Sequence, residues 1–253
     1  MRTYGAIIIG DEIMRGKRPD KHFAKLAALL GERGLYLSWA IYLGDERPRL
    51  VDTLRRSFAS GDVVFCFGGI GVTPDDHTRQ AAAAAAVVPL ALNPDAEREI
   101  RARMAEIGQE VTPTRLELGT VPQGSRIIPN PFNRIPGFSW GDHHFLPGFP
   151  QMAWPMAEWV LDTHYADDFR HGAETEAAIL VWDGLEGRMI DLMRQTEANF
   201  PGIKLFSLPT LGSASIRPNV ELGVRGAPAQ VAPAIAALRS GVIALGYLWE
   251  DKA

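Results

Sequence analysis

Cysteine is nearly absent from this chain of 253 residues, which contains one, Cys66. A single thiol can form neither an intrachain disulfide nor a cysteine-based zinc site. Cys66 stands inside the apolar run 63–67, where a free thiol behaves as a small hydrophobic side chain. We therefore expect Cys66 to be buried, and we do not expect it to be a catalytic nucleophile.

Long hydrophobic runs are missing as well. The longest apolar stretch, 81–92, contains Pro89 and is shorter than a bilayer span. The first apolar stretch, 6–9, is too short to be the core of a signal peptide. These features predict a soluble, cytoplasmic protein that does not act on a membrane.

The chain also lacks an excess of positive charge. It has 26 Lys and Arg against 30 Asp and Glu, a net charge of −4, so broad nucleic-acid binding through a basic face is not expected. The negative net charge does not exclude a local anion site built from backbone amides. The hydrophobic content of 46% is ordinary for a globular protein, and the length suits one large domain or a medium domain plus a small one.

Apolar strands and amphipathic helices alternate over the first part of the chain. We expect strands at 4–9, 35–43 and 63–67, separated by helices at 20–33 and 47–60. The first strand is apolar and rich in isoleucine, as is typical of a strand that is covered on both faces, and the third is continuously apolar. This order predicts an α/β fold with a mostly parallel sheet between two layers of helices.

The following region continues with helices and one hairpin. Gly141-Asp142 is a suitable hairpin turn between two apolar stretches, and Asn93 is a suitable N-cap for a helix. Helices are expected at 76–86, 95–107, 114–118 and 151–164, and hairpin strands at 135–140 and 143–146.

The C-terminal part predicts a second, smaller domain. The polar segment 165–174 is expected to be a linker. Beyond it the order β-α-β-β-α-β is typical of a ferredoxin-like α+β domain. The expected domains are 1–168 and 174–250. The expected strands of the second domain are 177–182, 203–208, 219–224 and 242–248, and its helices are 185–199 and 228–240.

Each of the first three strands ends in glycine followed by two acidic residues. These sets are Gly10-Asp11-Glu12, Gly44-Asp45-Glu46, and Gly68 with Asp75-Asp76. In open parallel sheets, ligands bind outside the carboxyl ends of the strands. Carboxylates beside a phosphate repel it unless a cation lies between them, which indicates Mg²⁺ or another divalent cation. The alternative interpretation is that such acids only stabilise the start of the next helix.

A glycine-rich loop follows the third strand. Gly68, Gly69 and Gly71 allow the backbone to approach a ligand closely, and the helix after Pro74 presents free N–H groups that suit a phosphate. The loop is neither a P-loop nor a GxGxxG loop, because its spacing is G-G-x-G. No HExxH or Gly-x-Ser-x-Gly motif is present, so neither a zinc peptidase nor a serine hydrolase is indicated.

These motifs resemble a known family. The run 68–78 resembles the GGxGxTxDDxT loop of the molybdopterin-binding (MoaB/Mog-like, MoCF) domain family, in its CinA-like branch (competence/damage-inducible protein A). Residues 9–13 with Gly16 are similar to the opening motif of that branch, Gly44-Asp45-Glu46 to its second strand end, and 146–150 to its LPGxP loop. The resemblance covers roughly residues 4–165.

The resemblance implies the fold of that family, followed by a small C-terminal domain and lacking the terminal amidohydrolase domain of full-length CinA proteins. It also implies a phosphorylated pterin or nucleotide as ligand and a homo-oligomer. From the net charge, no nucleic-acid partner is expected. Relatives act in molybdenum cofactor biosynthesis or hydrolyse dinucleotide pyrophosphates with a divalent metal.

The resemblance also implies a set of site residues. Asp45 and Asp76 take the catalytic and metal-binding positions. The implied ligand-binding residues are Gly10, Asp11, Glu12, Gly68, Gly69, Gly71, Thr73, Asp75, Thr78, Pro147, Gly148 and Pro150.

The chain departs from the family pattern at several positions. Asp11 replaces a threonine, 20–22 reads Asp-Lys-His in place of Asn-x-Asn, Val72 replaces a proline, and Gln151-Met152 shortens the usual segment after Pro150. Three functions stay open. The protein could be a metal-dependent pyrophosphatase acting on ADP-ribose- or FAD-like dinucleotides, a molybdopterin-binding protein, or a non-catalytic regulatory or interaction module.

Overall fold

A computed structural model describes residues 2–170, 172, 174–213 and 215–252. These residues divide into two units, Met1–Phe169 and Arg170–Ala253. The predicted domain limits, 1–168 and 174–250, lie beside this division. That each unit is an independently folding domain stays a prediction.

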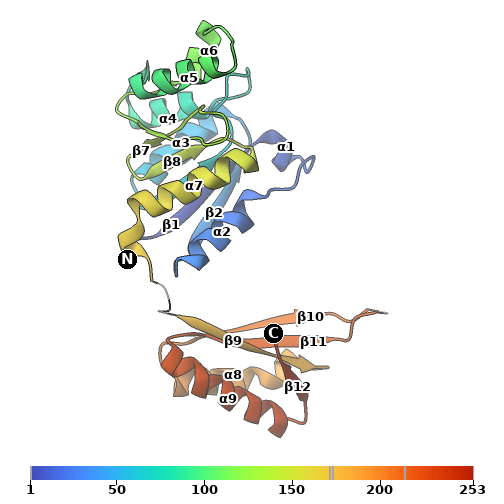
Figure 1. Ribbon diagram of the computed structural model, residues 1–253. Coiled ribbons are helices and arrows are strands. Elements are labelled where there is room, and N and C mark those ends of the chain that lie inside the picture. Colours follow the sequence, from blue (N-terminus) through green and yellow to red (C-terminus); the bar gives the residue numbers. More distant parts are fainter. Residues whose placement is uncertain (1, 171, 173, 214, 253) are drawn as a thin grey trace. The chain divides into compact units, whose positions relative to one another are not determined.

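The first unit is built on a six-stranded sheet in the order β2-β1-β3-β8-β7-β6 (Figure 1). The four strands β2, β1, β3 and β8 run parallel, and β7 and β6 add an antiparallel edge. The predicted α/β fold with a mostly parallel sheet is confirmed. The strands are β1 (Tyr4–Ile9), β2 (Leu37–Leu43), β3 (Val63–Phe67), β6 (Arg126–Ile128), β7 (Gly137–Trp140) and β8 (His143–Leu146).

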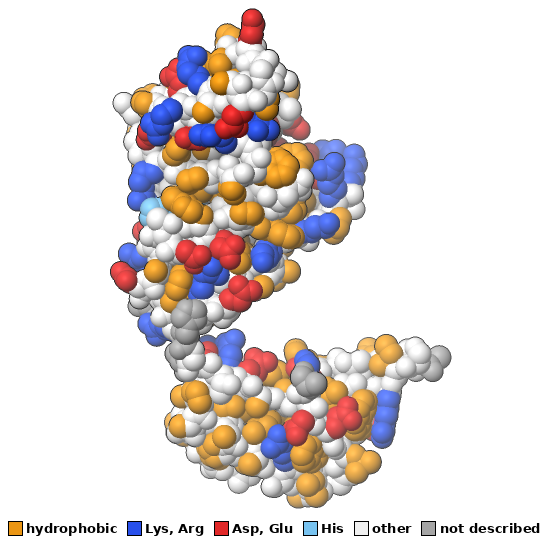
Figure 2. All heavy atoms as spheres, viewed as in Figure 1, with side chains coloured by type: hydrophobic (Ala, Val, Ile, Leu, Met, Phe, Trp, Pro, Cys, Tyr) orange, Lys and Arg blue, Asp and Glu red, His pale blue; other side chains and the backbone are white. Residues whose placement is uncertain are grey.

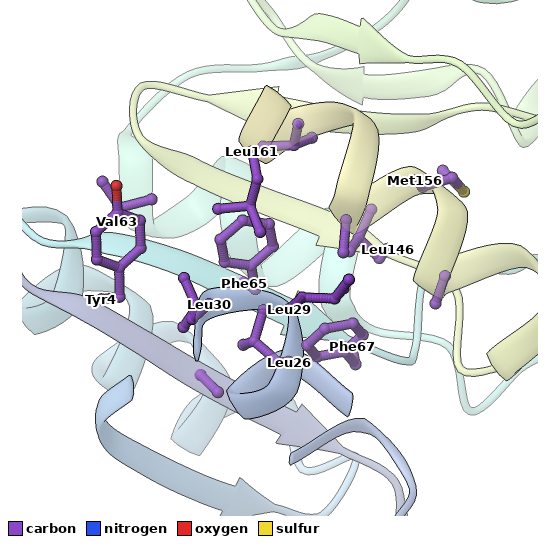
Figure 3. Packing of buried hydrophobic residues seen from close by; sticks show 14 of the residues in the cluster. Tyr4, Leu26, Leu29, Leu30, Val63, Phe65, Phe67, Leu146, Met156 and Leu161 are labelled. Atoms are coloured by element: carbon purple, nitrogen blue, oxygen red, sulfur yellow. The ribbon is translucent and has the colours of Figure 1, made fainter. Parts of the chain in front are cut away.

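Helices cover both faces of this sheet. Successive residues of a strand point to opposite faces, so β3 contributes Phe65 and Phe67 to one core and Val64 and Cys66 to the other. Figure 3 shows Phe67 packed near Leu26 on the first of these faces. Cys66 is fully buried, as predicted. The first core is covered by α2 (His22–Glu32) and α7 (Pro150–His164), and the second by α3 (Arg47–Phe58) and α4 (Thr78–Ala86).

The remaining elements of the first unit are short. A two-stranded antiparallel sheet joins β4 (Leu90–Leu92) to β5 (Thr120–Pro122), and neither strand was predicted. The other helices are α1 (Asp11–Met14), α5 (Pro94–Glu106) and α6 (Pro113–Glu117). On the face that Figure 2 shows, basic and acidic side chains lie interspersed over much of this unit.

The second unit has the predicted ferredoxin-like topology. Its four strands pair in the order β10-β11-β9-β12, and every pair is antiparallel. Ile179, Val181 and Leu222 from the sheet pack with Met189 and Leu238 from the helices. The strands are β9 (Thr175–Trp182), β10 (Lys204–Thr210), β11 (Asn219–Gly226) and β12 (Leu248–Asp251), and the helices are α8 (Glu186–Asn199) and α9 (Pro228–Ala244).

The predicted strand at 242–248 is wrong. The helix α9 continues to Ala244, because Ile235, Leu238 and Val242 repeat at helical spacing and all three are buried in the core of the second unit. The last strand begins later, at Leu248.

The expected linker at 165–174 is also partly wrong. Tyr165 is 2% exposed and packs in the core of the first unit, so the fixed structure extends beyond the end of α7. Its hydroxyl lies 2.7 Å from Nε2 of His144 and donates to Asp142 at 2.9 Å. A short 3₁₀ helix, Ala166–Asp168, follows directly.

His143 should make the protein less stable in acid. The side chain is buried with Nε2 2.7 Å from Oγ of Ser57, and burial lowers its pKa to about 4. The unfolded chain, with a histidine pKa near about 6.5, binds this proton first as the pH falls. We expect the wild type to lose about 3 kcal/mol more than His143→Gln in free energy of unfolding between pH 7 and pH 4, measured by urea denaturation. An equal loss in both proteins would contradict this assignment.

Candidate functional site

A cavity of about 460 Å³ lies at the carboxyl ends of β1, β3 and β8. The strand ends contribute Ile9, Phe67 and the loop after β8 to its wall. Because parallel strands end at one edge of the sheet, segments far apart in the sequence meet here. The glycines and acidic residues that follow the first three strands predicted a ligand site at this edge of the sheet.

The glycine-rich loop has a shape that only glycine permits at two positions. Gly68 has a φ of 103°, and a Cβ atom there would lie 2.2 Å from the carbonyl oxygen of Ile9. Gly69 has a φ of 67°, and its Cβ would lie 2.3 Å from Oγ1 of Thr78. The Thr78 hydroxyl donates to the carbonyl of Gly68 at 3.0 Å, and the Thr78 amide donates to that of Gly69 at 3.0 Å. Thr78 therefore holds the loop in place through hydrogen bonds to two of its backbone carbonyls.

Asp76 closes the far end of the same loop. Its Oδ2 atom accepts from the amide of Thr73 at 2.9 Å and also from the Thr73 hydroxyl. Behind the loop, the buried guanidinium of Arg79 donates to the carbonyls of Gly71 at 2.6 Å and Thr120 at 3.0 Å, and also to that of Glu117. One carboxylate and one guanidinium thus fix the loop conformation.

Asp11 and Asp45 join the ends of β1 and β2. The amide of Asp11 donates to Oδ2 of Asp45 at 2.9 Å, and the amide of Asp45 donates to Oδ1 of Asp11 at 3.2 Å. Gly44 leaves room for this contact, since a Cβ there would lie 2.5 Å from Oδ1 of Asp11. The other oxygen of Asp11 accepts from Arg15 at 2.7 Å.

The carboxyl group of Asp45 lies in a negative environment. Burial raises its pKa above the ordinary value, and the charges of Asp11, Glu12 and Asp75 raise it further, while the hydrogen bond from the Asp11 amide opposes them. Acidic side chains are therefore concentrated around Asp45, where a cation or a hydrogen-bond donor would be stabilised.

Part of the cavity lining is apolar. His22, at the start of α2, stacks on Phe67 with ring centroids 4.5 Å apart and an interplanar angle of 19°. Its Nε2 atom lies 3.2 Å from the carbonyl oxygen of Gly148. Met152 and the exposed ring of Phe149 extend this apolar part.

Most of the predicted site residues meet at this cavity. Three do not line it. Asp11 lies behind Asp45, Thr78 lies beneath the loop, and Pro150 is the first residue of α7. Those that line it are Gly10, Glu12, Asp45, Gly68, Gly69, Gly71, Thr73, Asp75, Asp76, Pro147 and Gly148. The catalytic and binding roles assigned to them stay predictions.

Several lining residues were not predicted as site residues. His22 belongs to the segment 20–22, where the chain departs from the family pattern, and that departure was the signal for it. Nothing in the sequence indicated Arg18. Asn130 and Asn133 come from a stretch without regular periodicity. The side chain of Asn130 donates to the carbonyl of Ile135 at 2.9 Å and accepts from the amide of Phe132 at 3.0 Å, so it shapes that wall.

The acidic residues do not form a metal site by themselves. Within the described ranges, no group of three or more His, Cys, Asp or Glu side chains could hold a metal ion. Oδ2 of Asp45 and Oδ2 of Asp76 already accept hydrogen bonds from the protein. A divalent cation here would need oxygen ligands from a bound phosphate as well.

Comparison with known proteins gives one family. Residues 5–165 match the family model described as a probable molybdopterin binding domain. A CinA-like protein from Syntrophotalea carbinolica is 34% identical over 157 residues, which are 60% of this chain and 38% of the relative. A CinA-like protein from Myxococcus xanthus is 34% identical over 146 residues, 56% of this chain and 35% of the relative. The match thus spans little more than a third of either relative.

A solved structure shows the same fold. The crystal structure of the protein CinA with unknown function from Thermoplasma acidophilum superimposes with a TM-score of 0.56 at 24% identity, covering 64% of this chain and 96% of that one. None of the helices in the described parts of the chain has the length and hydrophobicity needed to span a bilayer. The chain belongs to the probable molybdopterin binding domain family, as its motifs predicted, and the relatives to which it is similar include CinA-like proteins.

Proposed function

We propose that the cavity at the carboxyl ends of β1, β3 and β8 binds a phosphorylated pterin or nucleotide. The observation that carries this proposal is the loop at Gly68, Gly69 and Gly71, whose backbone lines the cavity with no side chain of its own to cover it. Backbone amides in such a loop suit a phosphate group. Family membership supports a pterin as one candidate ligand.

The size and composition of the cavity support a ligand with a flat ring. Its volume of about 460 Å³ lies in the range usual for small-molecule sites. Its lining includes the acidic Glu12 and Asp45 and the glycine-rich loop, and also the apolar Phe67, Phe149 and Met152. A molecule that carries both a phosphate and a heterocycle matches this mixed lining.

A second candidate function is divalent-metal-dependent hydrolysis of the pyrophosphate in an ADP-ribose- or FAD-like dinucleotide. The negative environment of Asp45 favours it, because acids beside a phosphate require a cation between them. Asp45 and Asp76 would hold that cation together with phosphate oxygens. A bound divalent cation would neutralise phosphate charge and lower the pKa of a water molecule.

Asp45→Asn tests the role of the acidic end. Asparagine can still accept from the amide of Asp11 but removes one negative charge. We expect the variant to bind ADP-ribose about 3–10-fold more tightly than the wild type without metal, since an unscreened repulsion of about 1 kcal/mol is removed. Calorimetric titration with and without Mg²⁺ measures this affinity. The increase in affinity that Mg²⁺ causes should be smaller in the variant than in the wild type.

The control is Asp52→Asn, which removes an exposed charge on α3, outside the residues that line the cavity. If both variants change affinity equally, Asp45 does not act at the binding site.

Turnover of ADP-ribose with Mg²⁺ or Co²⁺ decides between binding and hydrolysis. Activity no higher than that of Asp76→Asn would reject the hydrolase and leave binding alone. Failure to bind either a pterin or a nucleotide would favour the non-catalytic interaction module.

A further inference from the structure

Arg18 is a cation at the cavity that no group of the protein neutralises. The residue lines the cavity and is exposed, and it is the only Lys or Arg among the described residues that form the lining. Within the described parts of the chain, its guanidinium makes neither an ion pair nor a hydrogen bond. The nearby Arg15, by contrast, donates to Asp11 at 2.7 Å. Arg18 is therefore free to bind an anion that enters the cavity.

The same cavity offers Arg18 several acidic side chains, but it pairs with none of them. Glu12, Asp45, Asp75 and Asp76 belong to the lining and are all described in the structure. None of these four carboxylates forms an ion pair with Arg18. The planar guanidinium carries its donors in a fork that matches the oxygen atoms of a phosphate. An anionic ligand can therefore use the charge of Arg18 without first breaking an ion pair within the protein.

The backbone that carries Arg18 is fixed although the side chain is unpaired. The amides of Lys17 and Arg18 both donate to the carbonyl of Glu12, at 2.9 Å and 3.1 Å. Two residues further on, Asp20 accepts from the amide of His22 at 2.8 Å, at the start of α2. The segment between α1 and α2 is thus held at both ends. Binding through Arg18 costs mainly the freedom of one side chain, because the backbone is already ordered.

Arg18 and the glycine-rich loop belong to different segments of the chain. Arg18 follows β1 and α1, whereas Gly68, Gly69 and Gly71 follow β3. The loop offers backbone amides, which suit one phosphate, and Arg18 adds a full positive charge. Two anion-binding elements from separate segments line one cavity, and this arrangement suits a ligand with two negative groups.

We propose that Arg18 is a specificity-determining residue that binds a second negative group of the ligand, a phosphate beyond the one at the glycine-rich loop. This inference rests on the proposed function, because it takes the loop as the site of the first phosphate. The site then prefers a ligand with two linked phosphates to a ligand with one.

ADP and AMP differ by one phosphate and so test this preference. With Mg²⁺ present, we expect the wild type to bind ADP about tenfold more tightly than AMP. Arg18→Gln should bind ADP about tenfold more weakly than the wild type does, with its affinity for AMP nearly unchanged. Arg18→Lys keeps the charge without the fork and should keep part of the preference. Calorimetric titration measures the affinities, and thermal unfolding checks that the variants fold.

Lys17→Gln is the matched control. Lys17 is exposed and precedes Arg18, but it does not line the cavity. Its substitution removes the same charge and should change the ratio of the two affinities by less than about twofold, because an exposed charge away from the ligand is screened. If Arg18→Gln weakens both nucleotides equally, or if Lys17→Gln has the same effect, Arg18 acts only through net charge and the proposal is overturned.

Three further results bear on the inference. An Arg18→Gln protein that keeps the full preference for ADP would overturn it. A wild type that binds AMP or neopterin monophosphate at least as tightly as ADP would also overturn it, while leaving the proposed function intact, since a single phosphate would then suffice. A wild type that binds none of these three compounds would reject the proposed function, and this inference with it.

Discussion

Gly68→Ala should lower the free energy of unfolding by about 3–5 kcal/mol. The backbone at this position has a φ of 103°, where an alanine is strained, and the new Cβ would lie 2.2 Å from the carbonyl oxygen of Ile9. Ile9 ends the central strand β1, which is paired on both sides, so it cannot move aside without loss of sheet pairing. Urea denaturation followed by circular dichroism measures the change.

Gly61→Ala is the matched control for this prediction. Gly61 also has a positive φ, of 77°, but a Cβ there would meet nothing within 4 Å. Its substitution should cost only the backbone strain, about 1–2 kcal/mol. If the two variants lose the same stability, close contact with Ile9 does not constrain the loop.

Arg79→Met should be the second most damaging change, with a loss of about 3–5 kcal/mol and no measurable ligand binding. Arg79 is 2% exposed, and its guanidinium donates to three backbone carbonyls, of Gly71, Glu117 and Thr120. Methionine fills part of the space but leaves these acceptors unpaired in the interior. The loop at Gly71 would lose the hydrogen bond that the Gly71 carbonyl accepts from Arg79.

Arg101→Met controls for the loss of an arginine. Arg101 forms an ion pair with Glu97 on the surface of α5, and its removal should cost less than about 1 kcal/mol. Urea denaturation and titration with ADP-ribose distinguish the two variants. An Arg79→Met protein as stable as Arg101→Met would show that the three carbonyls do not depend on the guanidinium.

The edge of the sheet that holds the site was predictable because its signals are local. A glycine and two acids directly follow each of the first two strands, and a parallel sheet brings the ends of its strands together whatever the side chains are. The loop from Gly68 to Asp76 is likewise a single continuous segment. Gly68 and Gly69 do take left-handed backbone angles.

The apolar part of the lining was not predictable in this way, because its contacts join distant segments. His22 and Gly148 are 126 residues apart, and nothing near His22 in the sequence indicates a carbonyl partner. Asp11 and Asp45, 34 residues apart, illustrate the same limit. Their acidic side chains were expected near one another, but their reciprocal hydrogen bonds, which place Asp11 behind Asp45, were not.

Short elements were missed for a different reason. The strands β4, β5 and β6 have three residues each, too few to show an alternating pattern. The opposite error arose at 242–248, where a continuous apolar run fits a buried strand or a helix equally well. Only packing of α9 against the sheet of the second unit selects the helix there.

The central claim is that one cavity, between the loop at Gly68–Asp76 and the segment at Pro147–Phe149, receives a phosphorylated ligand. A crystal structure of the protein soaked with ADP-ribose or neopterin monophosphate and Mg²⁺ tests this most directly. We predict density for a phosphate beside the amides of Gly69 and Gly71, with the heterocycle inside the same cavity. Density only elsewhere on the protein, or none at saturating ligand, would contradict the account.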